Sequence, residues 1–248
     1  MKNSFTINLN DCVNTNDNYY FPNPIILDTN KQYKAGLVYF CGWNNIHNIT
    51  DENNVFSYSS DDGKSFKKIK LINGAYDISD IDKEIKRNLE INNDYDPKLK
   101  TYPINLEVFK MGSKVVLNIM NDKYYVDFVT LQNSLVNLLG FKKGYNIAEN
   151  HANITHIQSI HIDCDLIESN YVFRGDKKSI KRPLLYSFPA YTVPIGARIV
   201  ESPANPRMFP VHKKTIDFIN INIYDNNGKQ INFNNEPFGL EILICETF

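Results

Sequence analysis

The segment 154–168, ITHIQSIHIDCDLIE, carries the densest group of potentially reactive side chains in the sequence. Within it, His161, Asp163 and Asp165 are spaced two residues apart, and Cys164 lies between the two carboxylates. Imidazole and carboxylate groups are common zinc ligands, so this spacing raises the hypothesis of a cupin-type metal site. On a β-strand alternate side chains share a face, so the three project together along about 13 Å. Because zinc ligands must converge at about 2.0–2.2 Å, such a row requires a further ligand from another strand.

The same alternation also has a purely structural interpretation. Ile160, Ile162, Cys164 and Leu166 form a continuous apolar stripe on the opposite face, which would point into a core. The polar row is then the solvent face or the subunit face of a half-buried strand. We favour this interpretation and assign no catalytic, cofactor or metal residues, and metal binding by the polar row stays as the alternative.

Elsewhere the sequence lacks the motifs of other site chemistries. No G-x-S-x-G nucleophile motif occurs, and Cys41 and Cys164 lie in apolar strand patterns in which an inert thiol is usual. Asp61 and Asp62 precede Gly63, which is typical of a turn and lacks the spacing of a calcium or phosphate loop. Three histidines that could supply a further ligand have no motif around them: His151, His156 and His212. We therefore predict that the protein is not an enzyme and holds no cofactor.

Composition places the chain among globular proteins with a substantial core. It has 248 residues, of which 42% are hydrophobic, and a formal net charge of −1. This balance argues against nucleic-acid binding, and we interpret the basic runs at 67–70 and 176–182 as solvated surface. No stretch approaches the ~20 apolar residues of a membrane span. The four cysteines form no CxxC pair and the first residues do not resemble a signal peptide, so we expect a reduced, intracellular environment.

Alternating apolar and polar residues dominate the chain and predict about a dozen β-strands. A slip in the alternation at Phe218–Ile219 predicts a β-bulge. Over about 77–91 the apolar step changes to three and four, which predicts a helix with a stripe of Ile78, Ile81, Ile85 and Leu89. A second short helix is predicted over about 131–139. Without a βαβ rhythm, an internal repeat or a linker, we predict one all-β sandwich domain over 1–248 with two inserted helices.

An aromatic run, Tyr19 to Phe21, stands just before Pro22 and Pro24. Exposed aromatic rings could stack on sugars or on bases. More often such residues cover the end of a β-sandwich or form a subunit contact, and we favour this second interpretation.

The C-terminal third has the most specific order of motifs. Five prolines between 187 and 211 interrupt short strands, so this stretch must run at sheet edges and corners. With the segments upstream, the order resembles that of the minor capsid (penton) proteins of Polinton, or Maverick, elements and of virophages. The segments that carry the resemblance are 71–85, LLGF (138–141), IHIDC (160–164), SFP (187–189), PIGARIVESP (194–203), DNNG (225–228) and 231–242.

The resemblance implies a single jelly roll, with eight core strands in two facing sheets and helices in the connecting loops. It also implies a homopentamer at the vertices of an icosahedral capsid, in contact with a major capsid protein. The protein would belong to the virion, be made inside the host cell without secretion, and have no small-molecule substrate, membrane or nucleic-acid partner. Two alternatives stay open: a major-type capsid subunit, and a jelly-roll binding module or cupin-type metalloprotein.

Overall fold

A computed structural model describes residues 3–247 except for 100, 110–113, 128–132, 143–146, 155–156, 174–178 and 191. The chain packs as two compact units, which we call the sandwich unit (Met1–Ile46 with Ile157–Phe248) and the inserted unit (His47–His156). Each unit buries a hydrophobic cluster of its own. The sequence led us to expect one domain over 1–248, because no change of composition marks the point where the second core begins.

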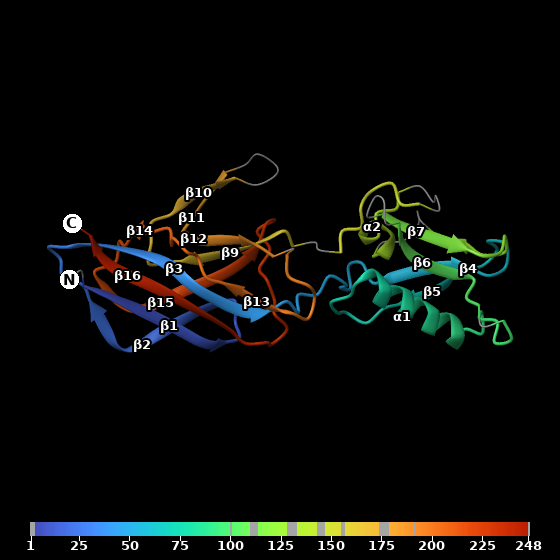
Figure 1. The fold of residues 1–248 in the computed structure, drawn as a ribbon, viewed down its shortest axis with the longest axis horizontal. Coiled ribbons are helices and arrows are strands. Elements are labelled where there is room, and N and C mark those ends of the chain that lie inside the picture. The colour runs from blue at the N-terminus through green and yellow to red at the C-terminus, as the bar shows by residue number, and fades with distance from the viewer. Residues whose placement is uncertain are drawn as a thin grey trace. The chain divides into compact units, whose positions relative to one another are not determined.

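Two antiparallel sheets form the sandwich unit (Figure 1). The first, the β3 sheet, contains in spatial order β1 (Ser4–Cys12), β16 (Phe238–Thr247), β3 (Gln32–Trp43) and β13 (Arg198–Glu201), and β14 (Phe209–Pro210) also pairs with β3. The second, the β9 sheet, contains β12 (Leu184–Pro189), β9 (Ser159–Cys164), β15 (Thr215–Asp225) and β2 (Asn16–Ile26). A separate pair is formed by β10 (Asn170–Phe173) and β11 (Ser179–Arg182).

The strand pairing identifies a jelly roll. Of the eight main strands counted along the chain, the first pairs with the eighth, β1 with β16, and the second with the seventh, β2 with β15. The third pairs with the sixth, β3 with β13, and the fourth with the fifth, β9 with β12. A long hairpin wrapped into two facing sheets produces this pattern, so the predicted fold class is confirmed.

Isoleucine and phenylalanine fill the space between the two sheets. The ring of Phe40 on β3 lies 5.3 Å from that of Phe188 on β12, measured between centroids, so the two sheets meet face to face. Two further rings surround Phe40, those of Phe233 at 6.3 Å and Phe238 at 6.1 Å. Aromatic pairs at these separations add attraction to the burial of their surface.

The bulge predicted in β15 is confirmed. The pairing of β15 with β2 shifts register between Ile216 and Phe218. A strict alternation would place Ile216 on the face opposite to Ile219, but the extra residue returns it to the inner face, and both side chains are fully buried.

The inserted unit contains shorter elements. One sheet contains β5 (Lys67–Lys70), β4 (Val55–Ser59) and β8 (Tyr125–Val126), and a second contains β6 (Ile104–Phe109) and β7 (Lys114–Ile119). The two helices are α1 (Ile78–Ile91) and α2 (Leu135–Leu138).

Both predicted helices are present in the inserted unit. Helix α1 begins after Asp77, whose side chain accepts a hydrogen bond from the Asp80 N–H at 2.8 Å, and it buries Ile81, Ile85 and Leu89. Helix α2 is shorter than the predicted 131–139, and residues 131 and 132 lie outside the described part of the chain. It is followed by Gly140 at a φ of 87°, a left-handed conformation that glycine adopts without strain.

Candidate functional site

The polar row of the sequence lies on β9 and directly after it. Strand β9 is an inner strand of its sheet, between β12 and β15, and Ile160, Ile162 and Cys164 point into the core with no exposed surface. The predicted apolar stripe is therefore confirmed. Burial of the thiol raises the pKa of Cys164 to about 12, so the sulfur stays protonated and unreactive at neutral pH.

Asp163 forms the most buried ion pair of the described residues. It is 4% exposed, and its Oδ2 accepts a hydrogen bond from Arg182 Nε at 2.7 Å. The guanidinium carbon of Arg182 lies 4.3 Å from the centroid of the Tyr224 ring, a cation–π contact from the neighbouring strand β15. Burial raises the pKa of Asp163, and the charge of Arg182 opposes this shift.

Asp165 has different partners. Its carboxylate forms an ion pair with Lys213 and accepts a hydrogen bond from the backbone N–H of Asn220 at 2.8 Å. The ammonium of Lys213 also lies 4.6 Å from the centroid of the Phe218 ring. Asp165 thus fixes the chain before β15 to the end of β9.

The surroundings of His161 favour its neutral form. Its Nε2 lies 2.8 Å from Ser159 Oγ, at hydrogen-bonding distance. Burial lowers the pKa of the imidazole, and the nearby Arg182 guanidinium lowers it further. Three buried atoms in this group make no hydrogen bond to the described residues: His161 Nδ1, Asp163 Oδ1 and Arg182 Nη2.

The geometry separates the three residues of the polar row into individual contacts. His161 meets Ser159, Asp163 meets Arg182, and Asp165 meets Lys213. Within the described part of the chain, no group of three or more His, Cys, Asp or Glu side chains is arranged to hold a metal ion. His212 contributes a backbone N–H to Leu166 O at 3.2 Å, and His156 lies outside the described residues.

Sequence reasoning missed Arg182 as a partner. We expected the basic run at 176–182 to be solvated surface, but the side chain of Arg182 is 12% exposed and pairs with Asp163. The expectation was wrong for Arg182 because its partner lies on another strand, and residues 176–178 lie outside the described part. The sequence held one weak signal for this pair: an arginine directly before Pro183, 19 residues after Asp163. In the other run, Lys67 pairs with Asp94 at 2.7 Å.

The aromatic run lies on β2, the edge strand of the β9 sheet. Tyr19 and Phe21 pack against the sandwich core, whereas Tyr20 is 72% exposed and contacts the Phe218 ring at 5.4 Å between centroids. Ile26 ends the same strand and is 79% exposed. An edge strand with two large exposed side chains is a surface suited to contact with another protein.

Neither a protein-family model nor a curated protein sequence matches the chain. Among solved structures, the crystal structure of the mavirus penton protein is similar, with a TM-score of 0.53 and 11% sequence identity. The match covers 99% of this chain and 100% of the penton chain, so it extends over both compact units. The resemblance to penton proteins that the motifs predicted is thus confirmed at the level of the fold. None of the described helices is long and apolar enough to span a membrane.

Proposed function

We propose that this protein is a minor capsid protein whose homopentamers form the vertices of an icosahedral virus or virus-like element. The observation that carries the proposal is the fold: an eight-stranded jelly roll interrupted between β3 and β9, similar over its full length to a penton protein. The role is structural and not enzymatic, and its place is the virion. The protein is made inside the host cell.

Edge strand β2 supports a ring contact in this proposal. It has 11 residues, pairs with β15 alone among the described strands, and exposes Tyr20 and Ile26. Pro22 and Pro24 lack N–H groups and so hinder the addition of a further strand. The neighbouring subunit therefore packs on these side chains rather than extending the sheet, and repetition of one such heterologous contact closes a ring.

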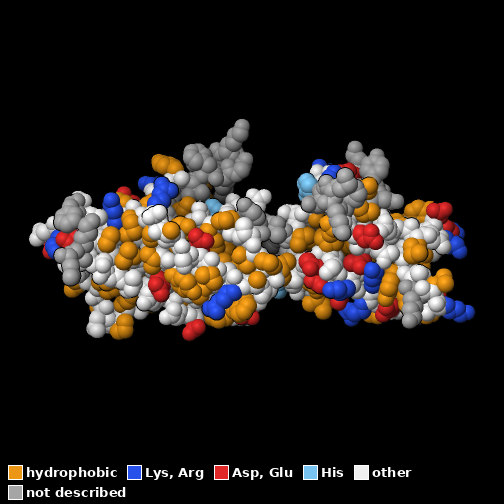
Figure 2. Space-filling view, in the orientation of Figure 1, with side chains coloured by type: hydrophobic (Ala, Val, Ile, Leu, Met, Phe, Trp, Pro, Cys, Tyr) orange, Lys and Arg blue, Asp and Glu red, His pale blue; other side chains and the backbone are white. Residues whose placement is uncertain are grey.

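The surface of the sandwich unit is compatible with extensive protein contacts. On the face drawn in Figure 2, hydrophobic side chains recur over this unit and charged ones are scattered between them. Val200 on edge strand β13 and Trp43 at the end of β3 add exposed apolar surface on the other sheet. We propose that the major capsid protein covers part of this surface.

The alternatives receive less support. A major-type subunit needs two jelly rolls, whereas the described strands of the inserted unit form one sheet of three strands and one of two. A cupin-type metalloprotein needs converging ligands, whereas the polar row of β9 is divided among Ser159, Arg182 and Lys213.

Co-assembly with the major capsid protein of the same genetic element tests the proposal. The two purified proteins are mixed, and the particles are imaged by electron cryo-microscopy. We expect particles whose fivefold vertices hold density for five sandwich units. Particles that close without this protein, together with no binding between the two proteins in solution, would contradict the proposal.

A further inference from the structure

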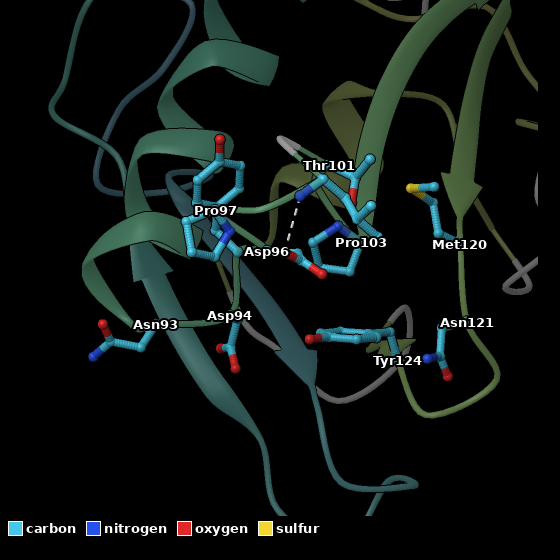
Figure 3. Close-up of a pocket in the computed structure, with 11 residues that line it drawn as sticks. Asn93, Asp94, Asp96, Pro97, Thr101, Pro103, Met120, Asn121 and Tyr124 are labelled. Carbon is cyan, nitrogen blue, oxygen red and sulfur yellow. Dashed lines mark hydrogen bonds between the residues drawn. The ribbon is translucent and has the colours of Figure 1, made fainter.

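The inserted unit contains an open pocket of about 470 Å³ (Figure 3). One wall is formed by residues of 93–99 and 101–103, which follow α1, and the other is the turn 120–124 between β7 and β8. Its volume lies within the roughly 300–1,000 Å³ that is typical of small-molecule sites. In Figure 3, Tyr124 and Asn121 lie on one side, and the Tyr124 hydroxyl is directed toward the side on which Asp94 lies.

The first wall is fixed by contacts that do not involve any ligand. Asp94 Oδ2 accepts hydrogen bonds from Tyr58 Oη at 2.6 Å and from Lys67 Nζ at 2.7 Å. Backbone hydrogen bonds join Asp96 and Thr101 in both directions, at 3.3 and 3.4 Å, and Asp96 Oδ1 accepts from the Leu99 N–H at 3.1 Å. This wall is therefore preorganised, which lowers the entropic cost of binding.

Several polar atoms at the pocket make no hydrogen bond to the described residues. They are Asp94 Oδ1, Asp96 Oδ2, the Tyr124 hydroxyl, and the amide nitrogens of Asn93 and Asn121. Burial and the charge of Asp94 raise the pKa of Tyr124, so its hydroxyl stays protonated as a donor. The pocket thus offers both donors and acceptors for hydroxyl groups.

Charge restricts the class of ligand. Two carboxylates, Asp94 and Asp96, line the pocket, and no lysine or arginine is among the lining residues that the structure describes. Lys67 neutralises only Asp94. A phosphate, sulfate or acidic sugar would be repelled by Asp96. A neutral ligand avoids this repulsion.

Apolar surfaces accompany the polar atoms. The Tyr124 ring, Pro97, Pro103 and Met120 line the same pocket, and Met120 at the rim is 61% exposed. A neutral pyranose ring has the matching chemistry, because its C–H faces pack on rings and apolar side chains while its hydroxyl edge pairs with carboxylates and amides.

We propose that the pocket formed by the described residues of 93–99, 101–103 and 120–124 binds a neutral sugar ring. Asp96 and Asn121 bind sugar hydroxyls, and the Tyr124 ring packs against a C–H face. Every described lining residue belongs to the inserted unit, so sugar binding can be tested on the protein without assembled capsids. If the proposed capsid function holds, the site would add an attachment function to the particle.

Saturation-transfer NMR with the full chain tests the proposal. The probes are the methyl glycosides of mannose, galactose and glucose, N-acetylglucosamine, the acidic sugar N-acetylneuraminic acid, and butylamine as a mimic of a basic side chain. We expect saturable binding of at least one neutral sugar and none of the acidic sugar. A glycan array then distinguishes a cell-surface glycan, which gives array binding, from a free sugar, which binds only in solution.

Variants locate the site. Tyr124→Ala and Asp96→Asn should each weaken binding by about tenfold or more, since each removes a direct contact. Tyr124→Phe keeps the ring and removes the hydroxyl, so it separates the contributions of these two groups to sugar binding. If Tyr124→Ala does not fold, Asn121→Ala replaces it as the second binding variant. Tyr125→Ala is the matched control, because this neighbouring tyrosine is exposed but does not line the pocket. Absence of any neutral-sugar binding, binding unchanged in both Tyr124→Ala and Asp96→Asn, or binding of butylamine in place of sugars would overturn the proposal.

Discussion

Strands in the sandwich unit extend to the 12 residues of β3, whereas described strands in the inserted unit have at most the six residues of β6 and β7. Long strands allow two sheets to enclose one continuous core and to present long edges outward. Short strands close a smaller core with the help of a helix, and leave loops that shape a pocket. The difference fits the proposed division of labour, in which the sandwich unit builds the capsid and the inserted unit presents a surface to other molecules.

Substitutions in the two cores should have the largest effects on the free energy of unfolding. These substitutions also test whether the two units unfold separately. Phe40→Ala removes a fully buried ring of the sandwich core, and should lower the free energy of unfolding of that unit by about 3–5 kcal/mol. Ile85→Ala should lower that of the inserted unit by about 2–5 kcal/mol. Hydrogen exchange followed by mass spectrometry reads each unit separately. Loss of protection in both units from either variant would show one cooperative domain instead.

The next effect contrasts a buried ion pair with an exposed one. Asp163→Ala leaves Arg182 buried without its partner, and should destabilise the sandwich unit by about 3 kcal/mol, at the low end for such changes. Lys70→Ala breaks an exposed pair with Asp51 in the inserted unit, and we expect no measurable change. Urea denaturation measures the stability of both variants. Equal destabilisation by both substitutions would contradict the expected difference between the buried and the exposed ion pair.

Acid should affect the sandwich unit first. The pKa of His161 is lowered in the folded state from its ordinary 6.5, mainly by burial. A base with a lowered pKa favours folding while it is neutral, so this contribution is complete above pH 6.5 and decreases as the pH falls through that value. Arg182 adds to the shift, while Asp163 and Asp225 oppose it. The urea concentration at the unfolding midpoint of the sandwich unit should decrease when the pH is lowered from 7.5 to 5.5. The decrease should be smaller in His161→Gln. An identical decrease in that variant would exclude His161 as the cause.

The smallest effect should occur in the inserted unit at lower pH. Hydrogen bonds from the Ser65 hydroxyl, the Ser65 N–H and the Ser59 hydroxyl lower the pKa of Asp61 to about 2. An acid with a lowered pKa stabilises the fold when ionised, so its contribution is complete above the ordinary value of 3.8 and is lost as the pH falls through about 2. Asp61→Asn should reduce the acid sensitivity of the inserted unit slightly between these values. NMR titration of the Asp61 carboxyl would contradict the account if its pKa were near 3.8.

Local patterns predicted the strands, both helices and the inward face of β9, because alternation and helical spacing are properties of neighbouring residues. The apolar stripe of α1 is an example. The second core and the pairing of Asp163 with Arg182 depend on contacts between distant strands, and no spacing in the sequence specifies them. The pocket was missed for the same reason, because its two walls come from separate segments of the sequence, 93–99 with 101–103 and 120–124.

The division of labour is tested most directly by the mass of the assembly in solution, measured by native mass spectrometry. We predict five times the 28.7 kDa of one chain for the unaltered protein and for Ile72→Glu, which alters an exposed isoleucine of the inserted unit. We predict monomers for Ile26→Glu, because a charge on edge strand β2 would be buried in the ring contact. A monomer for the unaltered protein at high concentration, or dissociation by Ile72→Glu but not by Ile26→Glu, would contradict the account.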